Sequence, residues 1–412
     1  MEQRCQWFFG SENFENKLKR QNIRNLATFA PLELGDTILA TPLYKALRAT
    51  YPDAHITVLS QLRNHPVLDG LSEFNSVVDY EPNADLSMFD LILLPALCGD
   101  NAIREHFDSY PNVISADRKY AGKRQSFINK WNGRYSHVLF YKHQVEMNME
   151  LAYEAGYAGP SIPPYCPQGD SSRFQQYREK IGLFINAPTN DFQAMANRQW
   201  PIAHWKSLVN RIGVASTLLV GGPTDRPQVE RLADETNSDF IVTESLAEFT
   251  GLCGVLKVLV TTDGGAMHAA ATSGVPIISL HGTSSPILLH PWIFHEDKCI
   301  SILSSNTCSP CQRTYRLQAC ESGLTKMDCL QNLKPEVVER AIGEINALVS
   351  GTCLVMKGNQ LMTKSAYLQS WRRSIAFALN YNAGRVALKF TSRRPKNAPV
   401  VLNAVRSSDT AH

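Results

Sequence analysis

The feature that most constrains the fold is a repeated alternation of short apolar runs with longer amphipathic segments. In the first half of the chain, strand-like runs occur in NLATFAPL, HITVLSQ, SVVDYE and FDLILLPAL, and TILATPLYKALRATYP carries apolar residues at helical spacing. Short strands separated by helices are typical of parallel α/β sheets. The sequence therefore predicts an α/β protein.

A second series of the same kind runs from IGLFINAP to VPIISLHG. Residues 156–172, GYAGPSIPPYCPQGDSS, are rich in Pro, Gly and Ser and are interpreted as a linker. A length of 412 residues suits two domains. We expect two facing Rossmann-like domains with a ligand in the cleft between them, at the carboxyl ends of the strands. The expected N-terminal domain covers residues 1–160, the C-terminal domain 173–345, and a basic tail 346–412.

The charge of the chain is unevenly distributed. The net charge is +3, but the last 62 residues carry ten Lys or Arg and one acidic residue. The basic balance belongs to this tail, so nucleic-acid binding by the main body is disfavoured. Within the tail, SAYLQSWRRSIAFALNY predicts an amphipathic helix, which either packs on the body or contacts an anionic membrane surface.

Three features indicate a cytoplasmic protein, peripheral at the inner membrane if the tail helix contacts lipid. No apolar run approaches the roughly 18 residues of a membrane-spanning helix. The N-terminus lacks an apolar segment followed by a small-residue cleavage site. Six of the ten cysteines are scattered, which is typical of reduced thiols; they are Cys5, Cys98, Cys166, Cys253, Cys299 and Cys353.

The stretch LELGDTILATP places Gly35 and Asp36 where the first predicted helix begins. Two interpretations of Asp36 are equally open. It is a carboxylate at the floor of the cleft that takes a proton from an acceptor hydroxyl as a general base. Alternatively, it is a plain helix N-cap.

The stretch TTDGGAMHAAATSG joins a strand to a helix of small residues through Asp263, Gly264 and Gly265, with His268 one turn later. A helix N-terminus offers unpaired N–H donors and partial positive charge, and glycine allows a pyrophosphate to approach the backbone closely. The stretch predicts a phosphate site. The alternative is a tight turn followed by a histidine with a structural role.

Three further polar residues are candidates for binding a nucleotide. Thr189 is placed to donate to a phosphate oxygen, and Arg198 to neutralise a leaving diphosphate with its planar fork. A solvated surface charge is the alternative for Arg198. Asp225, at the start of the helix after LLVGGP, is either a ligand of a ribose hydroxyl or a helix cap.

Four cysteines cluster in CSPCQRTYRLQACESGLTKMDC. A CxxC pair with two further thiolates fits a tetrahedral zinc or iron site, which would be structural because it leaves no open coordination position. Free thiols and disulfides stay open as alternatives. The four residues are Cys308, Cys311, Cys320 and Cys329, so the segment 308–329 is the expected cysteine finger.

Taken together, residues 25–345 resemble glycosyltransferase family 9, the bacterial heptosyltransferases of lipopolysaccharide core synthesis. The resemblance is carried by LGDTILATPLYKALRATYPDAHITVL, NRQWPIAHWKSLVNRI with LLVGGPTD, TTDGGAMHAAATSGVPIISLHGTSSP, and the cysteine segment running into LKPEVVERAI. It implies the two-domain GT-B fold, with the acceptor bound mainly by the N-terminal half and the donor by the C-terminal half.

The resemblance also implies an inverting transfer of heptose, or a similar sugar, from an ADP-sugar to a lipopolysaccharide-core or related glycan, with no metal or cofactor in the chemistry. The family's base falls on Asp36, and the nucleoside region lies near Asp225 and Glu244–Phe249. Gly264 stands where the family usually has Ser or Thr, and Arg198 where Lys is common. The implied donor-binding residues are Thr189, Arg198, Asp225, Ser245, Asp263, Gly264, Gly265 and His268.

Other functions remain open at this point. One is a GT-B transferase that uses another nucleotide sugar or a protein acceptor, since heptosyltransferases of autotransporter proteins are similar in carrying a cysteine finger. Another is a nucleotide-binding scaffold without catalysis. Product formation from ADP-heptose, against saturable ADP binding alone, separates enzyme from scaffold.

Overall fold

The computed structural model forms two compact units, residues 1–364 and residues 365–412, and both sheets lie in the first. It describes residues 23–62, 65–96, 103, 106–107, 109–110, 112–115, 143–186, 198–292, 298–306, 309–310, 329–357, 360–363, 366–367 and 369.

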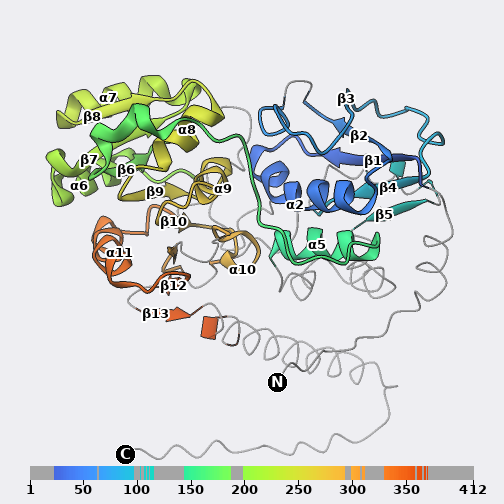
Figure 1. The fold of residues 1–412 in the computed structure, drawn as a ribbon. Coiled ribbons are helices and arrows are strands. Elements are labelled where there is room, and N and C mark those ends of the chain that lie inside the picture. Colours follow the sequence, from blue (N-terminus) through green and yellow to red (C-terminus); the bar gives the residue numbers. More distant parts are fainter. Residues whose placement is uncertain are drawn as a thin grey trace, which may run out of the picture. The chain divides into compact units, whose positions relative to one another are not determined.

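The first sheet has five parallel strands in the order β3-β2-β1-β4-β5 (Figure 1). Its strands are β1 (Asn25–Ala30), β2 (His55–Ser60), β3 (Ser76–Asp79), β4 (Leu91–Leu94) and β5 (Val113–Ser115). The helices α2 (Leu34–Thr50) and α5 (Gln144–Glu154) accompany it.

Alternate residues of the first sheet point to opposite faces, as the two-residue period of a strand requires. On one face, Leu26 and Leu93 pack in a core with residues of α2 and α5 such as Leu43 and Val145. On the other face, Phe29 joins a separate apolar cluster. The helices α2 and α5 therefore share one face of the sheet, and this brings their N-terminal ends together.

The second sheet has eight strands in the order β13-β12-β11-β10-β9-β6-β7-β8, and only β13 runs antiparallel to its neighbour. Its strands are β6 (Ile181–Phe184), β7 (Thr217–Gly221), β8 (Asp239–Val242), β9 (Val258–Thr262), β10 (Ile277–His281), β11 (Cys299–Leu303), β12 (Cys353–Lys357) and β13 (Gln360–Thr363).

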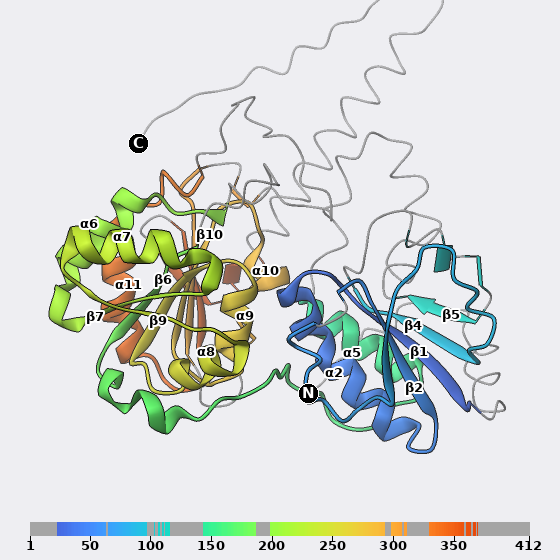
Figure 2. The ribbon, with the colours of Figure 1, turned by 90° about the horizontal axis from the view of Figure 1, so that it is seen from above.

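Helices cover both faces of the second sheet (Figure 2). One face packs against α6 (Ile202–Ile212), α7 (Arg226–Thr236) and α11 (Pro335–Ala347), and the other against α8 (Leu246–Cys253) and α9 (Gly265–Ala271). Strand residues alternate between the two cores, because both faces of a parallel sheet are buried. The short elements are α10 (Pro286–Leu289), η2 (Ser171–Tyr177), η4 (Val214–Ser216) and η5 (Pro223–Asp225).

Strand order reverses once in each sheet, between β1 and β4 in the first and between β6 and β9 in the second. Ligands of open α/β sheets bind at such switch points, outside the carboxyl ends of the strands. Asp36 follows β1, and Asp263 follows β9. Both candidate carboxylates therefore lie beside the switch point of their own sheet.

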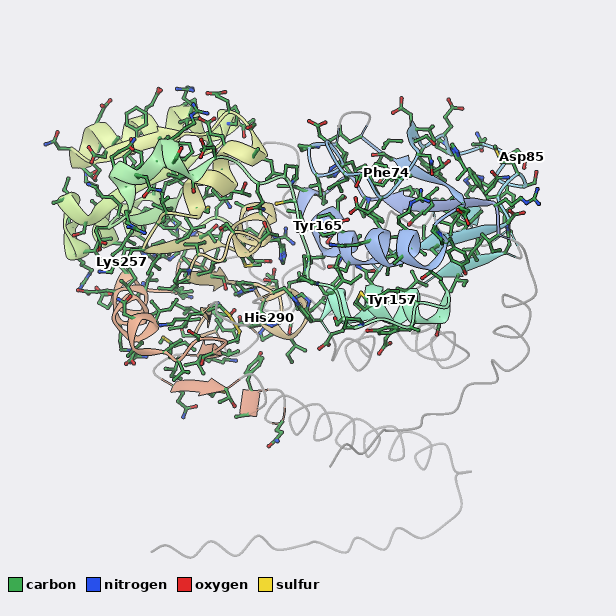
Figure 3. All side chains as sticks on the ribbon, in the orientation of Figure 1. Phe74, Asp85, Tyr157, Tyr165, Lys257 and His290 are labelled. Atoms are coloured by element: carbon green, nitrogen blue, oxygen red, sulfur yellow. A yellow bond between two sulfur atoms is a disulfide. The ribbon has the colours of Figure 1, made fainter. Side chains whose placement is uncertain are left out.

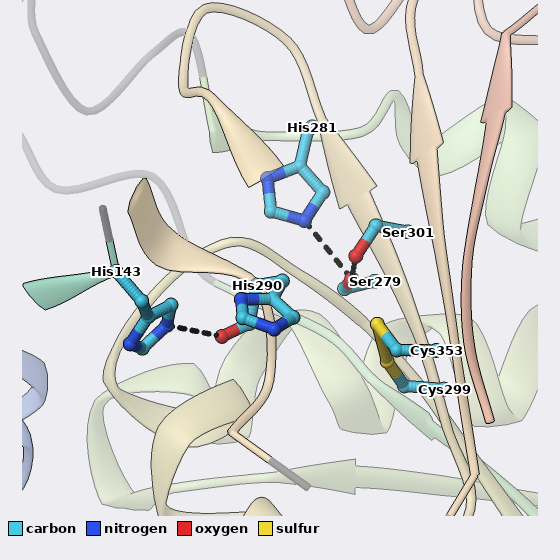
Figure 4. Close-up of a disulfide and its surroundings, with 7 residues drawn as sticks. All are labelled: His143, Ser279, His281, His290, Cys299, Ser301 and Cys353. Atoms are coloured by element: carbon cyan, nitrogen blue, oxygen red, sulfur yellow. Dashed lines mark hydrogen bonds between the residues drawn. A yellow bond between two sulfur atoms is a disulfide. The ribbon is translucent and has the colours of Figure 1, made fainter. Parts of the chain in front are cut away.

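The expectation of reduced thiols is wrong for two of the scattered cysteines. Cys299 and Cys353 form a disulfide between directly paired residues of β11 and β12, with their Cα atoms 4.7 Å apart (Figure 4). They are 54 residues apart in the sequence, so only the pairing of the strands brings them together. Cys166 and Cys253 are buried free thiols.

The segment interpreted as a linker is hydrogen-bonded to helices of both sheets' layers. The backbone N–H of Tyr165 donates to Thr41 of α2, 3.0 Å away, and the side chain of Gln168 donates to Thr272 at the end of α9, 2.9 Å away. Tyr157 and Tyr165, labelled in Figure 3, mark this segment. Its contacts with α2 and α9 make it part of the packed structure.

The second sheet runs on to Thr363, past the residue 345 at which the expected C-terminal domain ends. The domain boundaries stay a proposal. Most of the predicted tail helix lies outside the described residues. Within the described part of the chain, no helix has the length and apolar character needed to cross a membrane.

Candidate functional site

The N-terminal ends of α2 and α9 pack directly against each other. A Cβ atom placed on Gly35 would lie 2.9 Å from Cδ2 of His268. A Cβ atom placed on Gly265 would lie 2.9 Å from Cδ2 of Leu34 and 3.4 Å from the backbone nitrogen of Gly35. The contact therefore requires glycine at both helix starts, and it brings the turn after β9 to the turn after β1.

The two glycines of the turn after β9 have different reasons to be glycine. Gly264 has extended backbone, with φ of 165°, and a Cβ there would meet no heavy atom within 4 Å. The space around Gly264 therefore accepts a side chain, whereas Gly265 is confined by Leu34.

We expect Gly264→Ser to leave the melting temperature unchanged, and Gly265→Ser to lower the free energy of unfolding by about 1–3 kcal/mol through overpacking. Thermal unfolding of both variants measures this. Gly343→Ser is the control for adding a side chain in open space, because Gly343 also has no neighbour within 4 Å of its Cβ position. Equal losses at 264 and 265 would contradict the assignment.

Asp36 is not the cap of its helix. Glu33 is the N-cap residue of α2, and no side chain caps the helix end. Asp36 lies three positions further on, and its Oδ1 accepts a hydrogen bond of 3.3 Å from Nε2 of Gln144. The capping interpretation of Asp36 is therefore wrong, and a functional role remains the explanation to test.

Burial raises the pKa of Asp36 to about 7. The hydrogen bond from Gln144 and the positive charge of Arg198 lower its pKa, while the negative charges of Glu33 and Asp263 raise it, and burial outweighs them. A carboxylate with a pKa near the working pH is a better proton acceptor than an ordinary aspartate. Asp36 is thus suited to general-base chemistry at neutral pH.

Arg198 and Asp263 form a partly buried ion pair. Nε of Arg198 lies 3.6 Å from Oδ2 of Asp263, and their side chains are 26% and 3% exposed. Burial would raise the pKa of Asp263, but the positive charge of Arg198, with smaller contributions from His281 and His268, lowers it overall. Asp263 therefore stays ionised and holds the guanidinium near Asp36.

His268 is buried in α9, and burial lowers its pKa to about 4. At neutral pH the ring is uncharged, so it has one N–H to donate and adds no full positive charge to the site. Arg198 carries the positive charge of the site.

Among the described residues, Nδ1 of His268 is buried without a hydrogen-bond partner, and Nε of Arg198 and Oδ2 of Asp263 have only each other, at the 3.6 Å of their ion pair. Buried polar atoms in folded proteins are nearly always paired, so such a cluster needs an explanation. The first N–H groups of a helix lack intrahelical acceptors, and no side chain caps α9. The cluster is suited to a polar, anionic ligand.

The other candidate donor residues lie along the carboxyl edge of the same sheet. Asp225, after β7, accepts a 2.9 Å hydrogen bond from the backbone N–H of Gly222, and Ser245, after β8, caps α8 by accepting from the N–H of Glu248. These bonds give both residues a structural role, and nucleoside binding by them remains a proposal. Thr189 lies outside the described residues.

Two residues near the switch points were missed by sequence reasoning. Gln144, at the start of α5, holds Asp36 from 108 residues away. Asn186, after β6, donates a 2.6 Å hydrogen bond to Thr262 at the end of β9. The position of Asn186 after a predicted strand was a usable signal, whereas nothing local marks Gln144.

Among the described residues, no group of three or more His, Cys, Asp or Glu is arranged to hold a metal ion. Of the four clustered cysteines, Cys308, Cys311 and Cys320 lie outside the described residues. Cys329 is buried, and its backbone carbonyl accepts from the Ser304 hydroxyl. The structural metal site stays a prediction.

Sequence comparison identifies relatives of the chain. Residues 111–320 match the model of glycosyltransferase family 9 (heptosyltransferase), which is half of the chain. Lipooligosaccharide heptosyltransferase 2 of Haemophilus influenzae is 23% identical over 296 residues, 64% of this chain and 84% of that enzyme. Lipopolysaccharide heptosyltransferase 1 of Salmonella typhimurium is 27% identical over 208 residues, 48% of this chain and 60% of that enzyme.

Solved structures resemble the chain in fold. A glycosyl transferase of family 9 from Veillonella parvula has a TM-score of 0.56 at 16% identity, covering 78% of this chain and 97% of that one. The ADP-heptose lps heptosyltransferase II of E. coli has a TM-score of 0.53 at 20% identity, covering 78% and 98%. With the two parallel-dominated sheets, this confirms the expected α/β fold of the GT-B type.

Proposed function

The chain belongs to glycosyltransferase family 9, the heptosyltransferases, and we propose that it transfers a heptose, or a similar sugar, from an ADP-sugar to a glycan of the lipopolysaccharide core. Both relatives described above are named as heptosyltransferases of lipooligosaccharide or lipopolysaccharide. The cytoplasmic location and the contact of the basic tail with the inner membrane are parts of the same proposal.

The proposed chemical step is a direct displacement at the anomeric carbon. Asp36 takes the proton of the acceptor hydroxyl while that oxygen forms a bond to the anomeric carbon. The bond from that carbon to the diphosphate oxygen breaks, and its electron pair leaves with ADP. The anomeric configuration inverts, and Asp36 is left protonated until it releases the proton to solvent.

The proposed site for the departing charge combines Arg198 with the turn that begins α9. Arg198 supplies positive charge, neutral His268 supplies a hydrogen-bond donor, and Gly264 and Gly265 present backbone N–H groups. A fixed donor that meets developing charge contributes about 3–4 kcal/mol to lowering a barrier. The proposed chemical step uses no metal ion, and we expect transfer to continue without added divalent cations.

One observation carries the proposal: the start of α2, next to Asp36, packs against the start of α9, where a Cβ atom placed on Gly35 would lie 2.9 Å from Cδ2 of His268. The proposed base thus lies beside the proposed diphosphate site. A displacement reaction needs this juxtaposition, because attacking and leaving oxygens lie on opposite sides of one carbon atom.

The decisive experiment supplies the full chain with ADP-heptose and a lipopolysaccharide core oligosaccharide that lacks its heptoses. We expect release of ADP and an acceptor heavier by one heptose in the mass spectrum. Saturable ADP binding without product, for this and for truncated cores, would favour the non-catalytic scaffold. Release of UDP or GDP, with the corresponding UDP- or GDP-sugar as the only active donor, would leave a transferase with another donor.

The raised pKa of Asp36 predicts the pH dependence of transfer. Only the ionised carboxylate accepts a proton, so kcat/KM is expected to rise with pH up to about 7 and then level off. His268, with its pKa lowered to about 4, adds no step between pH 5 and pH 8. A pH–rate profile measures this, and an acid limb near the ordinary aspartate value would contradict the environment assigned to Asp36.

The four-cysteine segment is proposed to hold one structural zinc or iron ion. Metal analysis of the purified chain tests it: one equivalent of metal that is lost in Cys308→Ser supports the site. A metal-free chain that retains full activity and stability would remove it.

A further inference from the structure

The start of α5 reaches the proposed catalytic carboxylate from inside the first domain. Gln144 is the first residue of α5, and its side chain is fully buried. Its Nε2 lies 3.3 Å from Oδ1 of Asp36 and 3.2 Å from the backbone oxygen of Ala96, which follows β4. Gln144 thus bridges the two sides of the switch point of the first sheet.

The chemistry of the two partners fixes the orientation of this amide. The carbonyl of Ala96 and the ionised carboxylate of Asp36 are both acceptors, and only the NH₂ group carries two hydrogens to give. Its oxygen, Oε1, is buried and finds no donor among the described residues. An amide with both hydrogens committed holds the carboxylate in one place.

The backbone at Gln144 is itself anchored. His143 and Glu146 form a capping box, in which Nδ1 of His143 accepts from the N–H of Val145. Nε2 of His143 must therefore carry the hydrogen, and it donates 2.9 Å to the carbonyl of His290 (Figure 4).

One turn further along α5, Asn148 completes the anchor. Its side chain accepts from the N–H of Ala96 at 2.8 Å and donates to the carbonyl of Leu39 at 2.8 Å. Gln144 and Asn148 thus bind the two backbone groups of Ala96, but only Gln144 touches Asp36. This difference makes Asn148 a matched control.

We propose that Gln144 is a positioning residue that holds Oδ1 of Asp36, so that Oδ2 is presented to the acceptor hydroxyl. This inference rests on the proposed role of Asp36 as the base. Oδ2 accepts no hydrogen bond from the described residues. Because Gln144 is fully buried, it acts through Asp36 and does not touch substrate.

Two substitutions of similar size test the role. Gln144→Met removes both donors, and Gln144→Glu replaces them with an acceptor and a negative charge. Losing a hydrogen bond to the ionised form raises the pKa of a carboxylate, and a nearby like charge raises it further. The other charges that bear on Asp36, on Glu33, Arg198 and Asp263, are unchanged.

We expect the acid limb of kcat/KM to move up by about 1 pH unit in Gln144→Met and further in Gln144→Glu. At a pH well below the pKa of Asp36, a shift of about one unit lowers kcat/KM about tenfold, in addition to any decrease that is also seen at high pH. Asn148→Met, which loses two hydrogen bonds without touching Asp36, should lower the melting temperature and leave the limb in place. Equal shifts for Asn148→Met and Gln144→Met, or no shift in either Gln144 variant, would overturn the inference.

A measurement on the unaltered chain covers the case in which the Gln144 variants do not fold. The side-chain ¹⁵N signal of Gln144 should titrate with the pKa of Asp36, near 7, and this titration should vanish in Asp36→Asn. A signal that is constant between pH 5 and pH 9 would overturn the contact.

The two hypotheses fail separately. Normal transfer by Asp36→Asn would refute the general-base role of Asp36, whatever the results for the Gln144 variants. If Asp36→Asn is inactive but the acid limb of the kcat/KM profile is unchanged in the Gln144 variants, only the positioning role of Gln144 is refuted.

Discussion

Replacing Asp36 with Asn is expected to lower kcat for heptose transfer by about 10²- to 10⁴-fold, the usual contribution of a positioned base. The amide keeps the size and polarity of the carboxylate but has no basic oxygen with which to take the acceptor proton. Because Asp36 lies in α2, which packs on the first sheet, and the proposed diphosphate site follows β9 of the second sheet, ADP binding should be retained. Transfer is measured by product formation, and ADP affinity by calorimetry.

Asp36→Asn is expected to stabilise the fold at high pH, although it lowers activity. The pKa of Asp36 is about 7 in the folded chain and near 3.8 when unfolded, so its stability contribution is present below pH 3.8 and is lost as pH rises through 7. At pH 8, Asp36→Asn should therefore raise the free energy of unfolding by about 1–3 kcal/mol, and by little at pH 4. A loss of both activity and stability would instead mark Asp36 as a structural residue.

A matched comparison separates base chemistry from loss of a side chain. Asp90 lies at the opposite end of the first sheet, where its carboxylate accepts from the N–H groups of Arg24 and Asn25. Asp90→Asn should weaken these bonds and the fold while leaving kcat within about twofold. Near wild-type transfer by Asp36→Asn would refute the base assignment.

Replacing Arg198 with Ala is expected to lower kcat/KM by about 10²- to 10³-fold, because the leaving diphosphate loses the charge that meets it. The fold should also weaken by about 1–3 kcal/mol, since the buried carboxylate of Asp263 keeps its charge without its partner. Kinetics with ADP-heptose and urea unfolding measure the two effects.

The stability part of this prediction has a defined pH dependence. Arg198 lowers the pKa of Asp263, so the stability that this pair contributes is present above the unfolded pKa and is lost as pH falls. The loss in Arg198→Ala should therefore be largest at neutral pH and smaller in acid, where Asp263 accepts a proton.

A double substitution separates catalysis from folding. Adding Asp263→Asn to Arg198→Ala removes the unpaired charge and should restore much of the stability but none of the activity. Arg198→Lys keeps the positive charge and should retain part of the activity, although a point charge replaces a planar fork. Full activity in Arg198→Ala would show that the guanidinium does not meet the leaving group.

The sequence by itself determined the class of fold, because strand and helix periodicities are local properties. The apolar run FDLILLPAL was correctly predicted as a strand, and the amphipathic segment that forms α2 was correctly predicted as a helix. The motifs also placed Asp36 and Asp263 where a strand ends and a helix begins. The order of the strands then puts each residue beside a switch point.

Tertiary structure alone decided which residues meet. Gln144 contacts Asp36 across 108 residues, and Cys299 bonds to Cys353 across 54, because strand order and helix packing bring them together. Residue 265 must be glycine because a side chain there would collide with Leu34, and no pattern in the sequence of the turn reveals this contact. The pKa of Asp36 likewise follows from burial, a property of the packed molecule. Local periodicity specifies the elements, but long-range packing sets the neighbours and the solvation that give a side chain its chemistry.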